Sequence, residues 1–139
     1  MNIQYPLTIY YDASCPLCAA EMHTIKETDF ANKLILEDCS SQQFAEPPSC
    51  PTSKEAMMER IHAQDAAGQW IKGVDVFSAA YAAGGFSKLS KIWGSPMLRP
   101  LLSRAYPLIA DNRHWLSKTP LPYLFNAILR WSAPVKANM

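Results

Sequence analysis

The chain has 139 residues, of which 49% are hydrophobic and 18% charged, so it is long enough to bury one self-supporting core. Its 13 basic residues nearly balance its 12 acidic ones, and a net charge of +1 gives no electrostatic footprint for binding nucleic acid. The sequence contains nothing close to the roughly 20 consecutive apolar residues that a membrane-spanning helix needs. We therefore expect a single globular domain.

The N-terminal segment carries neither a basic region nor an apolar stretch long enough for a secretory signal peptide. The expected location is therefore cytoplasmic, in a reducing environment. Structural disulfides are rare there, so the four cysteines are expected to be reactive, metal-binding or simply buried.

Alternating apolar and β-branched residues predict a first strand over Tyr5–Tyr11. A short turn follows, and Cys15-Pro16 opens a helix with proline at its favoured first position. The short apolar run Leu34–Leu36 predicts a second strand. A strand, a helix of about 12 residues and another strand together predict a right-handed βαβ unit with parallel strands.

The first predicted helix is amphipathic, because its apolar residues recur at helical spacing. Its apolar face, which we expect to be buried, holds Cys18, Met22 and Ile25. Its solvent face is expected to hold Glu21, Lys26 and Glu27.

A polar, proline-marked loop leads to a short predicted helix near Ser53–Met58. The segments Arg60–Gln64 and Gln69–Lys72 then predict the two strands of a hairpin. Asp75 is expected to cap a third helix that runs to Gly84. This order of elements is that of a thioredoxin-like α/β domain with a βαβ-α-ββ-α core.

Residues 1–85 are therefore predicted to form the thioredoxin-like core, and residues 86–139 a helical C-terminal extension packed on the same domain. Pro107 is expected to kink the extension. The segment Leu121–Trp131 is apolar and aromatic with a single charge. We expect the extension, including this segment, to pack on the core. The alternative is that it contacts a partner protein or a membrane surface. One apolar helical face of the extension is predicted to contain Leu98, Leu101, Leu102, Ala105 and Ile109.

The most informative segment holds Cys15 and Cys18, separated by two residues at the predicted start of the first helix. Thiol-disulfide exchange needs one thiolate that attacks and a second thiol that resolves the mixed disulfide. At the helix N-cap, unpaired backbone N–H groups and the helix dipole lower the pKa of Cys15. Cys18, one turn deeper, is expected to be the more buried and more protonated resolving thiol. Pro16 is expected to hold the two sulfurs at the right spacing.

The segment Tyr10–Cys18 resembles the DCC family of thiol-disulfide oxidoreductases, which is named for an Asp-x-x-Cys-x-x-Cys motif, here Asp12 to Cys18. The resemblance continues through Ile61–Gly68 and ends near Ala110–Arg113, so that it covers about residues 7–115. It implies a thioredoxin-like fold and a dithiol-disulfide activity.

Three further residues are candidates for the site. Asp12 ends the first strand and is expected either to carry a proton to or from Cys18 or to close the turn by accepting backbone N–H groups. His62 lies on a predicted strand, either near the redox edge or in a purely structural position. Arg113 is a candidate for neutralising the Cys15 thiolate or a substrate carboxylate, with a helix-capping or packing role as the alternative.

Cys39 follows the second predicted strand, whose end lies at the same sheet edge as Cys15 if the first two strands are parallel. It is therefore a candidate auxiliary thiol, and Cys50 lies in the adjoining loop. A zinc site made from all four cysteines is a further alternative. The cysteine spacing lacks the second close pair of a zinc ribbon, so we expect no metal.

These observations together predict an enzyme that cycles the Cys15–Cys18 pair between dithiol and disulfide without an organic cofactor. Its expected partners are a protein or low-molecular-weight disulfide substrate and an external reductant, either a thioredoxin system or glutathione. The alternative is a catalytically silent thioredoxin-like module that docks partners through its apolar C-terminal helices.

Overall fold

The computed structural model describes residues 3–47 and 50–131, which contain four strands and seven helices. The strands are β1 (Leu7–Tyr11), β2 (Leu34–Asp38), β3 (His62–Gln64) and β4 (Trp70–Lys72). The helices are α1 (Pro16–Glu27), α2 (Lys54–Glu59), α3 (Val74–Ala83), α4 (Ser87–Trp93), α5 (Arg99–Asp111), α6 (Arg113–Ser117) and α7 (Leu121–Trp131).

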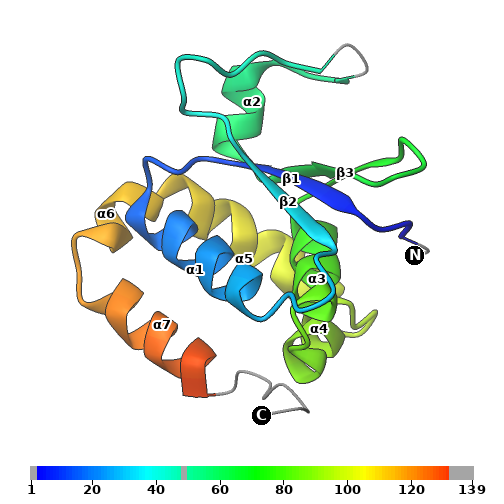
Figure 1. Ribbon diagram of the computed structural model, residues 1–139. Helices are drawn as coiled ribbons and strands as arrows, with labels where there is room; N and C mark the ends of the chain where they lie inside the picture. The colour runs from blue at the N-terminus through cyan, green and yellow to red at the C-terminus, as the bar shows by residue number, and fades with distance from the viewer. Residues whose placement is uncertain (1–2, 48–49, 132–139) are drawn as a thin grey trace.

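The four strands form one mixed sheet in the order β2-β1-β3-β4. β1 and β2 are parallel, as predicted, with Leu7 opposite Leu34 and Tyr11 opposite Asp38. β3 is antiparallel to both β1 and β4, which confirms the predicted hairpin. α2 lies over one face of the sheet, and α1 and α3 lie over the other (Figure 1). This arrangement confirms the thioredoxin-like α/β class.

β1 supplies side chains to both faces of the sheet, because successive residues of a strand point in opposite directions. Leu7 and Ile9 are fully buried in the main hydrophobic core. Tyr10 points the other way, into a smaller cluster with Cys39 and Met57 beneath α2. The end of β1, which leads into the turn before Cys15, is therefore packed on both faces of the sheet.

The faces of α1 agree with the sequence prediction except at Glu21. Met22 and Ile25 are buried, with exposures of 1% and 0%. Glu21, however, was expected to face solvent, and this expectation is wrong. α3 packs near this part of α1, and the hydroxyl of the buried Tyr81 donates a hydrogen bond to the Glu21 carboxylate.

The predicted capping role of Asp75 is also wrong. α3 begins at Val74, and its N-cap is Gly73, whose φ of 65° lies in the left-handed region that side chains disfavour. Asp75 lies in the first helical turn, where its carboxylate accepts hydrogen bonds from both terminal nitrogens of Arg99 at the start of α5. The carboxylate of Asp75 therefore links α3 to α5, and Gly73 occupies the N-cap position.

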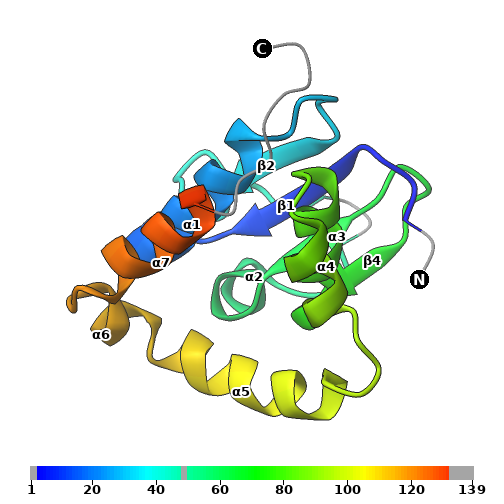
Figure 2. The same ribbon diagram turned by 90° about the horizontal axis from the view of Figure 1, so that it is seen from below.

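The C-terminal helices return to the core. α4 packs on α3, and α7 lies alongside α1 (Figure 2). Leu129 of α7 is fully buried in the main core, and Phe125 packs against that core. Residues 132–139 of the predicted extension lie outside the described residues.

The predicted apolar face of α5 is largely exposed, contrary to expectation: Leu98, Leu101 and Ile109 are 37%, 65% and 47% accessible. α5 is attached through other positions, because the ring of Tyr106 packs on Phe77 and Ala110 is buried. The expectation of burial is likewise only partly right for α7, where the exposed apolar side chains include Tyr123, Leu124, Ile128 and Trp131.

No helix in the described ranges is both long enough and apolar enough to cross a membrane.

Replacing Leu129 with alanine tests whether α7 is part of the folded core. Because this side chain is completely buried, we expect the free energy of unfolding to fall by about 2–5 kcal/mol in urea denaturation. Leu124→Ala on the same helix is the control, since Leu124 is 58% exposed and its truncation should change stability by about 0.5 kcal/mol or less. Equal effects of the two substitutions would contradict the packing described for α7.

Candidate active site

Cys15 occupies the N-cap of α1, where the sequence placed it. Its backbone is extended, with φ −90° and ψ 113°, and its Sγ accepts a hydrogen bond from the backbone N–H of Cys18 at 3.4 Å. Pro16 takes the first helical position, where no backbone donor is needed. The sulfur therefore replaces the oxygen of an ordinary N-cap side chain and faces the positive end of the helix.

Ser117, at the end of α6, covers the sulfur of Cys15 from the far end of the chain. Its Oγ lies 3.6 Å from Cys15 Sγ and accepts the backbone N–H of Leu17 at 3.3 Å. The same hydroxyl donates to the carbonyl of Arg113 at 2.7 Å, which fixes its orientation. Ser117 is a site residue that sequence analysis missed, because a serine 102 residues from its partner carries no local signal.

The surroundings of Cys15 favour its thiolate. A hydrogen bond from the Cys18 side chain makes the largest contribution, and the Cys18 backbone N–H, Ser117 and the charge of His114 add to it. Burial opposes these effects, but the balance lowers the pKa of the Cys15 thiol to about 5. At neutral pH the reduced protein therefore holds an anionic sulfur at this position.

Cys18 has the opposite electrostatic setting. Its hydrogen bond to Cys15, followed by burial and the nearby negative groups, raises the pKa of the Cys18 thiol strongly. The prediction that Cys18 is the more buried of the two is wrong, since Cys15 is 0% exposed whereas Cys18 is partly accessible. The cause is a tertiary contact, because Ser117 of α6 packs over the start of α1 and shields the Cys15 sulfur from solvent.

Asp12 connects the turn before α1 to α6. Its carboxylate accepts the backbone N–H of Ser14 at 3.0 Å, which is the predicted turn-closing bond. The other carboxylate oxygen lies 3.3 Å from the Arg113 guanidinium and 3.8 Å from the ring of His114. Arg113 also donates to the carbonyl of Ala110 at 2.8 Å, so it combines the predicted helix-capping contact with an ion pair.

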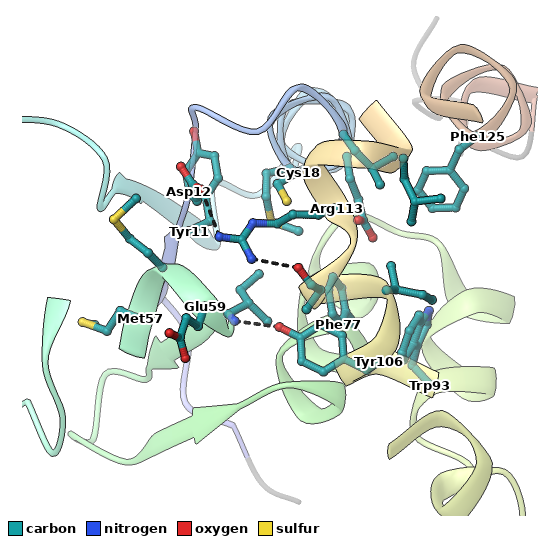
Figure 3. A pocket seen from close by; sticks show the side chains of 18 residues that line it. Tyr11, Asp12, Cys18, Met57, Glu59, Phe77, Trp93, Tyr106, Arg113 and Phe125 are labelled. Carbon is teal, nitrogen blue, oxygen red and sulfur yellow. Dashed lines mark hydrogen bonds and ion pairs between the residues drawn. The ribbon is translucent and has the colours of Figure 1, made fainter. Parts of the chain in front are cut away.

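A cavity of about 250 Å³ opens beside the cysteine pair, and Figure 3 shows the side chains gathered around it. Cys18 lines this cavity, whereas Cys15 does not. Most of the wall is apolar and comes from all seven helices together with the end of β1. Its larger apolar members are Met22, Met57, Met58, Phe77, Trp93, Ile109, Leu116 and Phe125.

Glu21 also lines the cavity, one helical turn after Cys18. Burial raises the pKa of its carboxyl to about 7, against the opposing effect of the Tyr81 hydrogen bond and with a contribution from the charge of Cys15. This second missed residue had a usable signal, because a residue three positions after Cys18 shares its helix face. A carboxyl with such a pKa exchanges protons near neutral pH.

His62 and Cys39, two further candidates from the sequence, do not line the cavity. His62 is opposite Tyr10 in the sheet, and its Nδ1 lies 2.8 Å from the carbonyl of Arg60, while burial lowers the pKa of its imidazole. Cys39 is fully buried beside Tyr10 and Met57, and burial raises its pKa to about 12. This setting favours a neutral thiol at Cys39.

The four cysteines do not form one cluster within the described ranges. Each of the four cysteines is a free thiol, and no three His, Cys, Asp or Glu side chains of residues 3–47 and 50–131 gather closely enough to hold a metal ion. Cys50 instead donates to the carbonyl of Thr52 at 3.1 Å and lies 3.6 Å from the sulfur of Met57.

The comparison with known protein families agrees with this geometry. The sequence profile described as DCC1-like thiol-disulfide oxidoreductase matches residues 9–119, a range that runs from β1 through the cysteine pair to just beyond Ser117. The chain belongs to this family. The match thus spans both the start of α1, which carries the two cysteines, and α6, which carries Ser117.

Among curated proteins, the chain is 28% identical over 117 residues to the Arabidopsis thaliana protein called "Uncharacterized protein At5g50100, chloroplastic". The aligned region covers 84% of this chain and 55% of that relative, so the chain spans about half the length of the curated relative it matches. No solved structure matches the chain significantly.

The pH dependence of cysteine alkylation tests the pKa values of the pair. With iodoacetamide, the Cys15 rate should rise with pH to a midpoint near 5 and then level off, because only the thiolate reacts. In a Cys15→Ser chain, Cys18 loses the hydrogen bond and the charge of Cys15 that raise its pKa, so it should react at lower pH than Cys18 of the wild type, though still at higher pH than Cys15, because burial continues to raise its pKa.

The Ser117→Ala variant should shift the Cys15 midpoint upward, since one hydrogen bond to the thiolate is lost. The matched control is Ser103→Ala, at an exposed position of α5. A Cys15 midpoint above 8 in the unmodified chain, where an ordinary thiol titrates at about 8.5, would contradict the site described here.

Proposed function

We propose that the protein is a thiol-disulfide oxidoreductase in which Cys15 is the nucleophile and Cys18 the resolving thiol. The observation that carries the proposal is the contrast between the two sulfurs: the surroundings lower the pKa of Cys15 to about 5 and raise that of Cys18. Family membership supports the reaction class. Thiol-disulfide exchange requires this division between an attacking thiolate and a thiol held in reserve.

In the proposed cycle, the Cys15 thiolate attacks one sulfur of a substrate disulfide. A Cys15–substrate bond forms, the substrate S–S bond breaks, and the leaving thiolate takes up a proton. Cys18 then loses its proton and attacks Cys15 Sγ, which releases the second substrate sulfur and forms the Cys15–Cys18 disulfide. The dithiol is oxidised by two electrons, and the substrate disulfide is reduced by the same number. An external thiol reductant restores the dithiol.

We propose Glu21 as the acceptor of the Cys18 proton. Cys18 cannot attack until it loses this proton, and the strongly raised pKa makes spontaneous loss rare at neutral pH. Glu21 lines the same cavity one helical turn away, and its pKa of about 7 lets it accept and release a proton near neutrality. Tyr81 holds the carboxylate by its hydroxyl hydrogen bond.

Supporting roles follow from the remaining contacts. Pro16 shapes the first turn of α1, while Asp12 and Arg113 hold α6 against the turn that precedes Cys15. We therefore propose that residues 1–85 and the extension 86–139 work as one domain, since the core carries the dithiol and the extension carries Ser117. The roles predicted for His62 and Cys39 are left out of this proposed cycle.

The proposed partners are a disulfide substrate and a thiol reductant such as a thioredoxin system or glutathione. Thioredoxin systems and glutathione maintain reducing compartments, so the cytoplasm remains the proposed location. The name of the Arabidopsis relative refers to the chloroplast, so the chloroplast is the alternative location to be tested by fractionation.

A second candidate function is a protein-docking module, and exposed apolar side chains on α5 to α7 favour it. Leu101, Leu108, Trp115, Tyr123 and Trp131 are each more than 60% accessible. Apolar surface of this kind marks interaction sites in many soluble proteins. Retention of the cellular role by a Cys15→Ser chain would favour docking over catalysis.

Titration in mixtures of reduced and oxidised glutathione tests the redox assignment. We expect the wild-type chain to form a Cys15–Cys18 disulfide, detected by mass spectrometry after alkylation of the remaining free thiols. Cys15→Ser should abolish exchange, and Cys18→Ser should accumulate a glutathione adduct on Cys15, because the resolving thiol is gone. Cys39→Ser is the control and should behave like the wild type.

The Glu21→Gln variant tests proton transfer from Cys18. We expect the first attack by Cys15 to be retained and the resolving step to slow by about 10²–10⁴-fold near neutral pH, the range typical of general base catalysis. Stopped-flow measurements should show accumulation of the mixed disulfide and loss of the dependence of resolution on a group with pKa about 7. Glu27→Gln, at an exposed position of the same helix, is the control. An unchanged pH profile of resolution would remove Glu21 from the mechanism.

A further inference from the structure

We propose that the cavity beside Cys18 is the substrate site and that it selects a neutral, apolar, low-molecular-weight disulfide. This inference rests on the proposed thiol-disulfide function and adds the class of substrate. It follows from the size and lining of the cavity, from the covering of Cys15, and from the charges on the cavity wall.

The cavity is large enough for a small organic molecule. Its volume is about 250 Å³. An apolar protein cavity of about 150 Å³ can bind benzene, so the space here accommodates a ligand somewhat larger than one aromatic ring. The aromatic residues Phe77, Trp93 and Phe125 and the flexible Met57 and Met58 form much of its wall (Figure 3). Such a wall favours an alkyl or aromatic body.

The limited accessibility of the two sulfur atoms favours a small substrate over a protein. Cys15 is 0% exposed because Ser117 lies over it, so a protein disulfide cannot reach the thiolate directly in this conformation, whereas a reductant can attack the partly accessible Cys18 of the oxidised pair. Cys18 lines the cavity and is hydrogen-bonded to Cys15, which places the thiolate directly behind the Cys18 end of the cavity. A disulfide held in the cavity therefore lies against Cys18, and the Cys15 thiolate reaches it when the Cys18 side chain turns aside.

The charges on the wall disfavour an anionic substrate. The cavity is lined by the carboxyl groups of Asp12, Glu21 and Glu59 and by the guanidinium of Arg113. Both terminal nitrogens of Arg113 are already used, one in the ion pair with Asp12 and the other in a hydrogen bond to the Ala110 carbonyl. A ligand carboxylate would meet an excess of negative groups, whereas a neutral ligand would not.

Two further polar groups of the wall are engaged, although the Nε of Arg113 is buried without a hydrogen-bond partner among the described residues. The hydroxyl of Tyr106 accepts the backbone N–H of Ile61 at 2.7 Å, and the Glu21 carboxylate is held by Tyr81. These groups shape the cavity without being set aside for a highly polar ligand such as glutathione. Glutathione can still act as the external reductant, since that step requires attack on the protein disulfide and no seat in the cavity.

The substrate step balances with these groups and one proton from water. Cys15 thiolate attacks the ligand disulfide, Cys18 passes its proton to Glu21 and resolves the adduct, and both ligand sulfurs leave as thiols after protonation. The protein ends as the Cys15–Cys18 disulfide and the ligand as the dithiol, or as a pair of thiols, with two electrons transferred.

Lipoamide and lipoic acid provide a matched test, because they share a cyclic disulfide and an alkyl chain and differ in the charge of the terminal group. With the reduced full-length chain in stopped flow, we expect lipoamide to oxidise the Cys15–Cys18 pair at least about tenfold faster than lipoic acid. Glutathione disulfide should be slower than lipoamide as well. Equal rates for lipoamide and lipoic acid would overturn the proposed selection of neutral ligands.

Two substitutions that fill the cavity test its location. Ala110→Leu adds bulk at a buried wall position, and Ile109→Trp does so at a wall position that is 47% exposed and therefore less able to disturb folding. Each should lower kcat/KM for lipoamide by about tenfold or more. Ala82→Leu, at an exposed position of α3 outside the wall, is the control and should have no effect.

Failure of this inference can be told apart from failure of the proposed function. If the wild-type pair is oxidised by glutathione disulfide but neither filling variant alters the lipoamide rate, the redox function stands and the cavity is not the substrate site. If no disulfide reagent produces the Cys15–Cys18 bridge, the redox function itself is wrong.

Discussion

The structure depends on one interaction, the capping of α1 by the sulfur of Cys15. The cap satisfies a backbone N–H at the start of the helix, and the helix in return stabilises negative charge on the sulfur. Local folding and chemical reactivity are therefore coupled at the same atom. Pro16 and the parallel pairing of β1 with β2 fix where the helix starts, and the sheet thus sets the position of the thiolate.

The C-terminal helices complete this site and also restrict it. α6 is held to the turn before Cys15 by the ion pair between Asp12 and Arg113, and it brings Ser117 to the sulfur. The same contact removes Cys15 from solvent and leaves Cys18 facing a cavity inside the molecule. An open thioredoxin-like helix start is suited to protein disulfides, whereas a covered one is suited to a small ligand that enters beside it.

The site holds a negative charge on Cys15 and the exchangeable protons on Cys18 and Glu21. At the mouth of α1, hydrogen bonds and the charge of His114 keep Cys15 anionic. One turn deeper, the hydrogen bond to Cys15, followed by burial, keeps Cys18 protonated, and burial brings the pKa of Glu21 close to neutrality. For the proposed exchange, Cys15 and Cys18 hold the required protonation states before the substrate arrives, and Glu21 can gain or lose a proton near neutral pH.

The sequence by itself determined the local features: the alternation of β1, the helix start at Cys15-Pro16, the hairpin, and through them the thioredoxin-like order of elements. These depend on neighbours within a few residues, which a pattern can reveal. Tertiary structure alone decided that Ser117 covers Cys15, that Glu21 turns from solvent to Tyr81, and that the apolar face of α5 stays exposed. Each of these depends on how helices distant in the chain pack together. Spacing along α1 places Glu21 on the same face as Cys18, but it does not reveal that Tyr81 is its partner.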